Sequence, residues 1–219
     1  MVAMTKALQI SSEQIATARL ATSWLLWYPD ENLISRVDEI AEVVKYLPEN
    51  SRLPLENFLG FLKSTPITEI QAHYVAVFDM KRRACPYLTY WTDGDTRNRG
   101  GAILKFKQAY LESGFDLGSE ELADHLSVVL EFAAVGNSLT GDALLTEHQG
   151  PINLLRDALL KMNSMYAQVV EAVLATLPEM TPELARRMEE LAAAGPPVEH
   201  VGLEPFSLSP TIDTLGGRR

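Results

Sequence analysis

The stretch SSEQIATARLATSWLLWYPDE, residues 11–31, sets the pattern on which the predicted fold rests. Apolar residues recur every three to four positions along it, which is the spacing of one face of an α-helix. Ser11 precedes Gln14 by three residues, the capping-box spacing that starts a helix. Pro29 ends this helix, and Asp30 can cap the next one. The stretch therefore predicts an amphipathic helix followed at once by a second helix.

The same helical period extends over most of the chain, and no convincing run alternates apolar and polar residues as a strand does. Further helices are predicted over residues 31–47, 54–64, 67–79, 96–112, 120–135, 152–177 and 182–194. Ser119 is the expected cap of the helix at 120–135, and a loop is expected at 136–149. We predict an all-α, single-domain helical bundle of about eight helices over residues 1–194. A flexible Pro/Gly-rich tail follows at 195–219.

The overall composition narrows the class of protein. The chain has 219 residues, a formal net charge of -10 and a single cysteine, Cys85. This length suits one sizeable domain that buries a core without disulfides. No stretch approaches the roughly 20 apolar residues of a membrane helix, and no secretory signal is evident, so we expect a cytoplasmic protein without membrane insertion. The acidic balance argues against nucleic-acid binding, which depends on neutralising phosphates.

Positive charge gathers in one segment of this acidic chain. Residues 81–107 contain seven Lys/Arg against two Asp/Glu, a balance of +5, so the other residues carry -15, with 12 basic against 27 acidic. Such a segment is either a solvated face with internal ion pairs or a patch that orients the protein toward an acidic partner or cofactor.

The loop before the predicted helix at 96–112 has the composition of a ligand site. A calcium-binding EF-hand would need a ligand where Arg97 stands and a glutamate where Leu104 stands. A phosphate site at this helix start lacks the Gly-Lys-Ser/Thr ending of a P-loop, and no strand precedes it as in a dinucleotide fingerprint. The mismatch with the calcium-binding motif and the lack of either phosphate-binding motif favour a structural interpretation of the loop.

In that structural interpretation each residue of the loop has a local role. Asp93-Gly94 forms a turn, and Thr96 caps the helix that follows. Arg97 and Arg99 reach back to Asp93, Asp95 or nearby carbonyls. The Gly100-Gly101 pair would let another helix approach closely, at a propensity cost of about 1 kcal/mol for each glycine.

No catalytic or metal-binding set stands out elsewhere. The histidines, His73, His125, His148 and His200, show no paired metal spacing, and no serine lies in a Gly-x-Ser-x-Gly elbow. Asp124 and His125 are an acid–base pair by composition. Adjacent residues on a helix point about 100° apart, so these two side chains are not expected to form a catalytic dyad with each other. Glu121 lies one helical turn before His125, so a surface pair between these two is the structural alternative. We expect no catalytic residues, no metal and no cofactor.

Three stretches carry a family resemblance: WLLWYPDE (24–31), YVAVFDMKRRACPYLTYWTDGDTRNRGGAILKFKQAY (74–110) and ELADHLSVVLEFAA (121–134). In order and spacing they resemble the NarJ family, within the TorD/DmsD/NarJ group of assembly chaperones for molybdenum enzymes. The resemblance covers about residues 15–175. The family often has proline immediately before the Asp-His pair, where Ala123 stands here, so a fixed proline bend is not expected.

The resemblance implies a TorD/NarJ-like helical chaperone that serves respiratory nitrate reductase in anaerobic respiration and nitrate assimilation. Such chaperones bind the N-terminal peptide of the catalytic (alpha) subunit within the apo alpha-beta complex. They hold it competent for molybdenum cofactor insertion and delay its attachment to the membrane subunit. We expect a monomer, with a dimer as the alternative.

In the wider group, the Asp-His segment lies in the groove that binds the client peptide. The expected client-binding residues here are Leu122, Asp124, His125, Leu126, Tyr28, Asp95, Arg97 and Arg99. If Asp124 faces a basic client, Asp124→Asn weakens binding with little change in melting temperature, and His125 makes binding depend on pH between about 6 and 8. The alternative function is a small hydrolase or nucleotide-dependent enzyme that uses Asp95, Arg97, Asp124 and His125.

Overall fold

The computed structural model describes residues 10–118 and 121–197, and the regular elements within those ranges are helices. The one β-type pairing found there is an isolated antiparallel bridge between Tyr87 and His125. The predicted all-α class is therefore confirmed. No helix in the described ranges is long and apolar enough to cross a bilayer. Ser119 and most of the expected tail lie outside the described residues.

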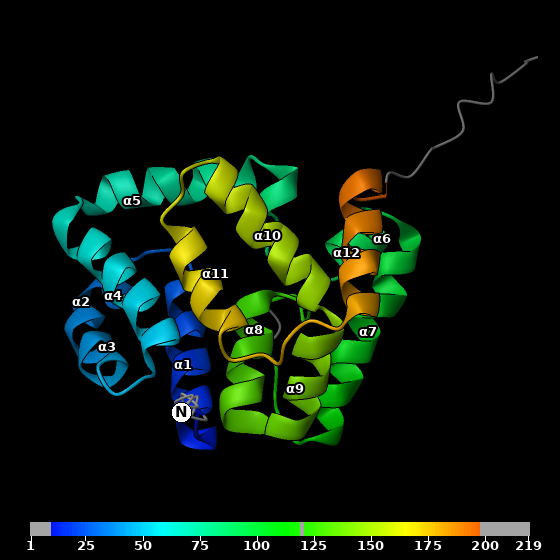
Figure 1. Cartoon of the computed structure of the whole chain (residues 1–219), viewed down its shortest axis with the longest axis horizontal. Helices are drawn as coiled ribbons and strands as arrows, with labels where there is room; N and C mark the ends of the chain where they lie inside the picture. The colour runs from blue at the N-terminus through cyan, green and yellow to red at the C-terminus, as the bar shows by residue number, and fades with distance from the viewer. Residues whose placement is uncertain (1–9, 119–120, 198–219) are drawn as a thin grey trace, which may run out of the picture.

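Figure 1 shows how the elements follow one another along the chain. In order they are α1 (Ser12–Leu25), α2 (Glu31–Ser35), α3 (Val37–Val44), α4 (Glu49–Ser64), α5 (Ile67–Tyr74), η1 (Val75–Asp79), η2 (Arg82–Ala84), α6 (Tyr90–Asp93), α7 (Arg97–Glu112), α8 (Leu126–Glu131), η3 (Phe132–Gly136), α9 (Ser138–Glu147), α10 (Gln149–Lys161), α11 (Tyr166–Leu174) and α12 (Pro182–Ala194). The elements η1 and η3 are π-helical turns that continue α5 and α8, and η2 is a 3₁₀ turn.

Several helices start at the signals predicted from the sequence. Ser11 and Gln14 form both hydrogen bonds of the capping box at the start of α1, each at 3.1 Å. The carboxylate of Asp30 accepts from the Leu33 amide at 2.8 Å, and Thr181 caps α12 in the same way. These caps satisfy amides that have no partner within the helix, so they depend on local sequence alone.

Two predicted helices are divided, and a third starts later than expected. The helix expected at 31–47 breaks at Arg36, and the one at 152–177 breaks at Asn163, whose φ of 51° is left-handed. Asparagine tolerates this conformation better than most residues. The helix expected from 120 begins only at Leu126, because the preceding residues pair with the segment around Tyr87 instead.

Two segments predicted as loops are helical instead. Residues 138–147 form α9, whose start is capped by the side chain of Asn137, which accepts from the Thr140 amide at 3.1 Å. The sequence also predicts a loop between Pro48 and Pro54, but α4 begins at Glu49 and contains Pro54. Both helices pack against other elements, α4 on α3 and α11 and α9 on η3, and this packing overrides the weak local signals.

The hydrophobic core surrounds α1, which contacts α3, α8, η3 and α11. In Figure 1, α1 lies between the α2–α4 group on one side and α8 and α9 on the other. Tyr166 on α11 is the centre of an aromatic cluster, with ring centroids 4.8 Å from Phe58, 4.9 Å from Phe78 and 5.6 Å from Tyr74. These rings join α4 and α5 with η1 to the central helices.

The space around individual glycines shows where the helices pack closely and where the surface is open. A Cβ at Gly141 would overlap the backbone of Ala133, whereas a Cβ at Gly100 or Gly101 would meet nothing within 4 Å. The expected close helix approach at Gly100-Gly101 is therefore wrong for the part of the chain described here, and the close approach occurs at Gly141 instead.

A matched pair of substitutions tests this difference. Gly141→Ala should lower the free energy of unfolding by about 1–3 kcal/mol through overpacking. Gly100→Ala should raise it by about 0.5–1 kcal/mol, because alanine is the better helix former where space is open. Urea unfolding of both variants measures the two changes. Changes of the same sign would contradict the packing described here.

Candidate functional site

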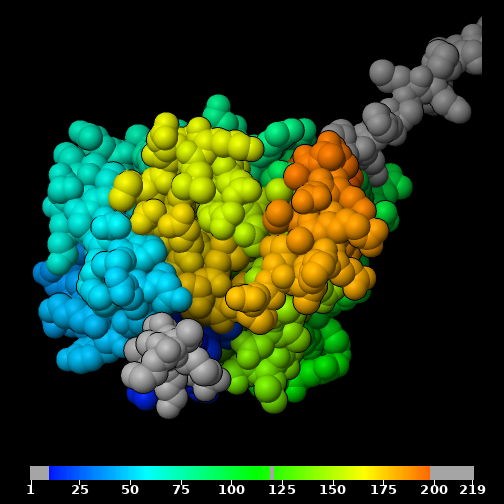
Figure 2. Space-filling model, viewed as in Figure 1, coloured from blue at the N-terminus to red at the C-terminus, as the bar shows by residue number. Residues whose placement is uncertain are grey.

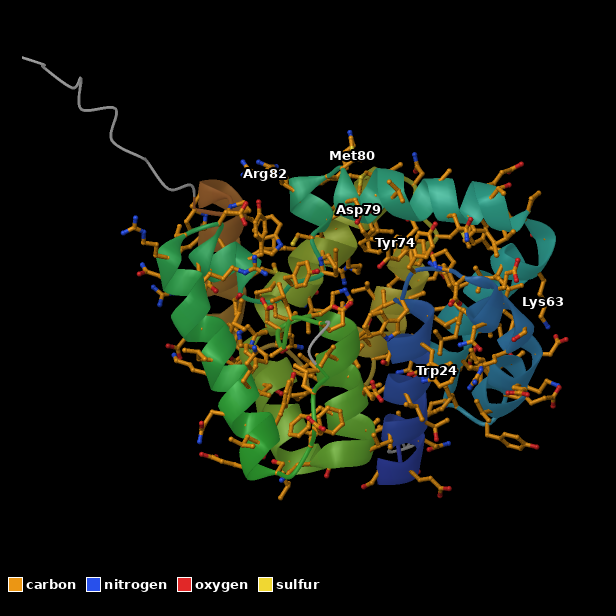
Figure 3. The ribbon with its side chains drawn as sticks, turned by 180° about the vertical axis from the view of Figure 1, so that it is seen from behind. Trp24, Lys63, Tyr74, Asp79, Met80 and Arg82 are labelled. Carbon is orange, nitrogen blue, oxygen red and sulfur yellow. The ribbon has the colours of Figure 1, made fainter. Side chains whose placement is uncertain are left out.

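Three hollows of about 440, 430 and 450 Å³ adjoin one another, and we call them together the Trp27 groove. The first and second share Trp27 and Glu131, and the second and third share the residues from Phe115 to Gly118 together with Glu121. The full lining consists of Trp24, Trp27, Tyr28, Asp30, Asn32, Leu33, Lys107, Tyr110, Leu111, Gly114, Phe115, Asp116, Leu117, Gly118, Glu121, Val128 and Glu131. Trp24, labelled in Figure 3, places one end of the groove on α1.

The groove combines aromatic walls with negative charge. Trp24 and Trp27 come from α1 and the residues just after it, and Phe115 and Leu117 come from the segment after α7. Four carboxylates line the groove against one ammonium group, that of Lys107. Such a surface suits a ligand with an apolar face and positive charge.

The position of Trp27 depends on His125 beneath it. The two rings are stacked, with centroids 5.5 Å apart and planes 22° apart, and Tyr87 meets the imidazole edge-on at 5.1 Å. The Nδ1 atom of His125 accepts a hydrogen bond from the Ser127 amide at 3.2 Å and so caps α8. His125 therefore joins the start of α8 to the floor of the groove.

Asp124 is a fully buried carboxylate with charged and neutral donors around it. Its Oδ2 accepts from the Thr89 hydroxyl at 2.6 Å, the Thr89 amide at 3.3 Å and the Arg99 guanidinium at 3.4 Å. Arg99 also lies over the ring of Tyr87, 5.1 Å from its centroid. Backbone bonds extend this junction, because the Leu88 amide donates to the Asp124 carbonyl at 2.9 Å. The Asp-His pair therefore holds residues 86–90 against α8.

Burial decides the charge state of His125. It lowers the pKa of the imidazole to about 4, against a smaller opposite influence of Asp124. The ring is therefore neutral near pH 7, and the expected titration between pH 6 and 8 is wrong. The expected surface contact of Asp124 with a client is also not possible in this conformation, because the side chain has no exposed area.

The predicted site residues separate into three groups. Tyr28 and Leu122 are 46% and 40% exposed, and Tyr28 lines the groove. Asp124, His125 and Leu126 lie below the surface. Arg97 and Arg99 lie in the first turn of α7, and Asp95 lies just before it. None of the three lines the hollows of the Trp27 groove. Their part in client binding remains a prediction, and Arg99 is the member that connects α7 to Asp124.

Sequence reasoning missed the residues that form most of the groove. Glu131 lies within the stretches that carried the resemblance, as do the two tryptophans, Trp24 and Trp27, for which no binding role was predicted. Their three-residue separation beside Asp30 was the available signal. Phe115 had no such signal in the sequence.

The α6–α7 loop has part of the predicted structural role. Thr96 is the N-cap residue of α7, but its hydroxyl donates to the Asp93 carbonyl at 2.7 Å and makes no cap hydrogen bond. Gly94 has a φ of 60° in the turn after Asp93, and Asp95 pairs with Arg82 at 3.3 Å and with Arg99 at 3.8 Å. The set proposed for an enzyme is not assembled, because its members Asp124 and His125 are buried and Asp95 is at the surface. Within the described residues, no group of three or more His, Cys, Asp or Glu side chains is placed to hold a metal.

The chain is similar to one protein family and to several individual proteins. Residues 45–171 match the family model described as nitrate reductase delta subunit. Over 160 residues the chain is 31% identical to the probable nitrate reductase molybdenum cofactor assembly chaperone NarJ of Bacillus subtilis, covering 72% of this chain and 86% of that protein. It is 35% identical over 115 residues to the corresponding NarJ of Escherichia coli (strain K12), covering 51% and 49% of the two chains.

Two further comparisons concern length and fold. The chain is 36% identical over 159 residues to the nitrate reductase-like protein NarX of Mycobacterium tuberculosis, a match that covers 70% of this chain and 23% of NarX. The chain thus spans under a quarter of that longer relative. A crystal structure of a putative redox enzyme maturation protein from Archaeoglobus fulgidus shares the fold, with a TM-score of 0.56 and 21% identity over 72% of this chain and 90% of that one.

Proposed function

This chain belongs to the nitrate reductase delta subunit family, and from that premise we propose that it is an assembly chaperone for a respiratory nitrate reductase and not an enzyme. Both NarJ relatives are named as molybdenum cofactor assembly chaperones. The burial of Asp124 and His125 also argues against direct catalysis by the pair. We place the protein in the cytoplasm, as a monomer that meets the apo alpha-beta complex before its attachment to the membrane.

The client in this proposal is the N-terminal segment of the catalytic (alpha) subunit, and the Trp27 groove is its binding site. The observation that carries the assignment is the contiguous groove with aromatic walls and an excess of carboxylates. An amphipathic segment would place apolar side chains on Trp24 and Trp27 and its basic side chains near Asp30 and Glu131. Holding this segment would keep the apo subunit competent for cofactor insertion.

The contacts of such a groove suit a temporary complex. Micromolar binding requires about -8 kcal/mol, which a few buried aromatic contacts supply after the cost of ordering the peptide. Exposed carboxylates at the rim would mainly raise the association rate and set the specificity. A chaperone must also release its client, so moderate affinity is consistent with the role.

Calorimetry with a synthetic peptide of the alpha-subunit N-terminus tests the site. We expect micromolar binding with a negative heat-capacity change, because apolar surface is buried. Trp27→Ala should weaken binding by about 30-fold, corresponding to the roughly 2 kcal/mol of a central aromatic contact. Glu131→Gln should weaken it less, and this effect should diminish as salt is added.

Tyr46→Ala is the matched control, since Tyr46 is 78% exposed and lines none of the three hollows. It should bind the peptide as the unmodified protein does. Circular dichroism of each variant confirms that the helices remain. Equal affinities for Trp27→Ala and Tyr46→Ala would place the client elsewhere.

A further inference from the structure

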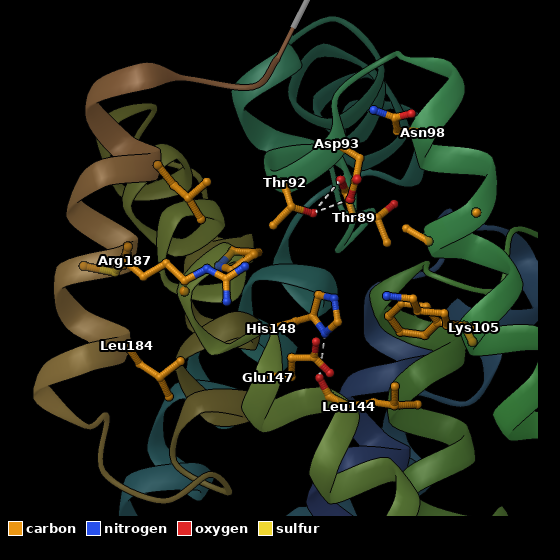
Figure 4. A pocket seen from close by; sticks show the side chains of 17 residues that line it. Thr89, Thr92, Asp93, Asn98, Lys105, Leu144, Glu147, His148, Leu184 and Arg187 are labelled. Carbon is orange, nitrogen blue, oxygen red and sulfur yellow. Dashed lines mark hydrogen bonds between the residues drawn. The ribbon is translucent and has the colours of Figure 1, made fainter.

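Another cavity, of about 570 Å³, lies between α7, α10 and α12 and shares no residue with the Trp27 groove. Figure 4 shows it from close by. Phe106, Leu144 and Pro151 give it an apolar floor, and Leu184 and Met188 line it from α12. In Figure 2, α12 lies on the surface of the molecule, and none of its residues is buried. The cavity thus separates α12 from α7 where tight packing would be expected.

The cavity wall that α7 forms has unfilled space beside Gly101. Gly101 lines the cavity, and a Cβ there would meet nothing within 4 Å. Glycine weakens a helix relative to alanine, and no contact among the described residues uses the space. A chain segment could therefore approach the α7 backbone at this point.

Two cations face the cavity from opposite sides. In Figure 4, Lys105 extends from α7 and Arg187 from α12, and none of the ion pairs found in the described ranges involves either side chain. Asp93 and Glu147 also line the cavity, and the Asp93 carboxylate accepts from the Thr92 hydroxyl at 2.6 Å. An acidic side chain between Lys105 and Arg187 would have two cationic partners.

The described chain ends beside this cavity. The Pro197 carbonyl lies so close to Gly94 that a Cβ there would overlap it, and Gly94 follows Asp93, which lines the cavity. Residues 198–219 follow, and they contain the sequence Leu203-Glu204-Pro205-Phe206, in which two large apolar residues flank a carboxylate. Leu203 lies six positions after Pro197, a reach of at most about 20 Å.

We propose that this C-terminal segment docks in the cavity of its own chain. Leu203 and Phe206 cover the apolar floor, and Glu204 lies between Lys105 and Arg187. The short connection gives the segment an effective concentration of about millimolar, so individually weak contacts suffice to hold it. Docking would also hold α12 against α10 from the side where its own packing is incomplete.

The test uses the full-length protein with single substitutions in the segment. Phe206→Ser should shift the methyl resonance of Met188 and increase amide hydrogen exchange in α12 several-fold. Ile212→Ser, a matched apolar change farther along the same segment, should leave both measurements as in the unmodified protein. Gly101→Leu should act like Phe206→Ser, because it fills the wall while improving helix propensity.

A charge exchange tests the position of Glu204. Glu204→Lys should increase exchange in α12, and combining it with Lys105→Glu should restore part of the protection. Unchanged Met188 and α12 signals in Phe206→Ser, or equal effects of Phe206→Ser and Ile212→Ser, would overturn the proposal. Signals that vary with protein concentration would overturn it too, because they would indicate docking between copies.

Discussion

Asp124→Ala is expected to lower the free energy of unfolding by about 3–5 kcal/mol. The carboxylate is fully buried and accepts from Thr89 and Arg99, so its removal leaves buried donors without a partner. The Arg99 side chain is 15% exposed, which makes the loss of its buried counter-charge costly. Urea unfolding followed by circular dichroism measures the change.

Asp95→Ala is the matched control for this prediction. Asp95 pairs with the same Arg99 from the solvent side, at 3.8 Å, and its side chain is 57% exposed. Exposed pairs contribute about 0–1 kcal/mol, so this variant should remain near the unmodified stability. Asp124→Asn should lie between the two, since it keeps the shape and loses the charge. If both alanine variants lost the same stability, the buried junction would not have the role described here.

Acidification should lower the free energy of unfolding through the buried His125. Burial lowers its pKa to about 4, below the value of about 6.5 in the unfolded chain, so the unfolded state binds the proton more readily. This contribution to stability is complete above pH 6.5 and is lost as the pH falls from 6.5 toward 4. Each pKa unit corresponds to about 1.4 kcal/mol, so the fall from about 6.5 to about 4 corresponds to a total loss of about 3.5 kcal/mol.

His125→Asn isolates this contribution. Asparagine can still cap α8, whereas it cannot take up the proton. Above pH 7 the variant should be less stable than the unmodified protein, because Trp27 loses its stacking partner. Toward pH 4 the difference between the two should narrow. Unfolding curves at several pH values give the slope of the free energy of unfolding against pH for the variant and for the unmodified protein. Parallel slopes from pH 4 to 6.5 would show that His125 does not carry the effect.

These two residues connect stability to the proposed client site. His125 supports Trp27, and Asp124 holds the segment that contains Tyr87, which meets the same imidazole. We therefore expect both residues to act on peptide binding by positioning Trp27. Their variants should weaken binding through a less ordered groove, without a direct contact to the client.

The helical class and several helix ends follow from the sequence by itself. The capping box at Ser11, the Asp30 cap and the Thr181 cap act within four residues of chain, so no distant partner is needed to form them. The turn at Gly94 is local for the same reason. The family resemblance implied the TorD/NarJ-like fold. Its three stretches include residues of the core and residues of the groove.

Other features were decided only by the tertiary structure. The start of α8 at Leu126 depends on its amide bonding to the Pro86 carbonyl, and the helix α9 depends on Gly141 packing against Ala133. The Trp27 groove likewise assembles residues from 24–33, from 107–118 with Glu121, and from 128–131. Residues far apart in the chain become neighbours only when the core forms. Burial then determines whether Asp124 and His125 meet solvent, and a sequence pattern cannot show that desolvation.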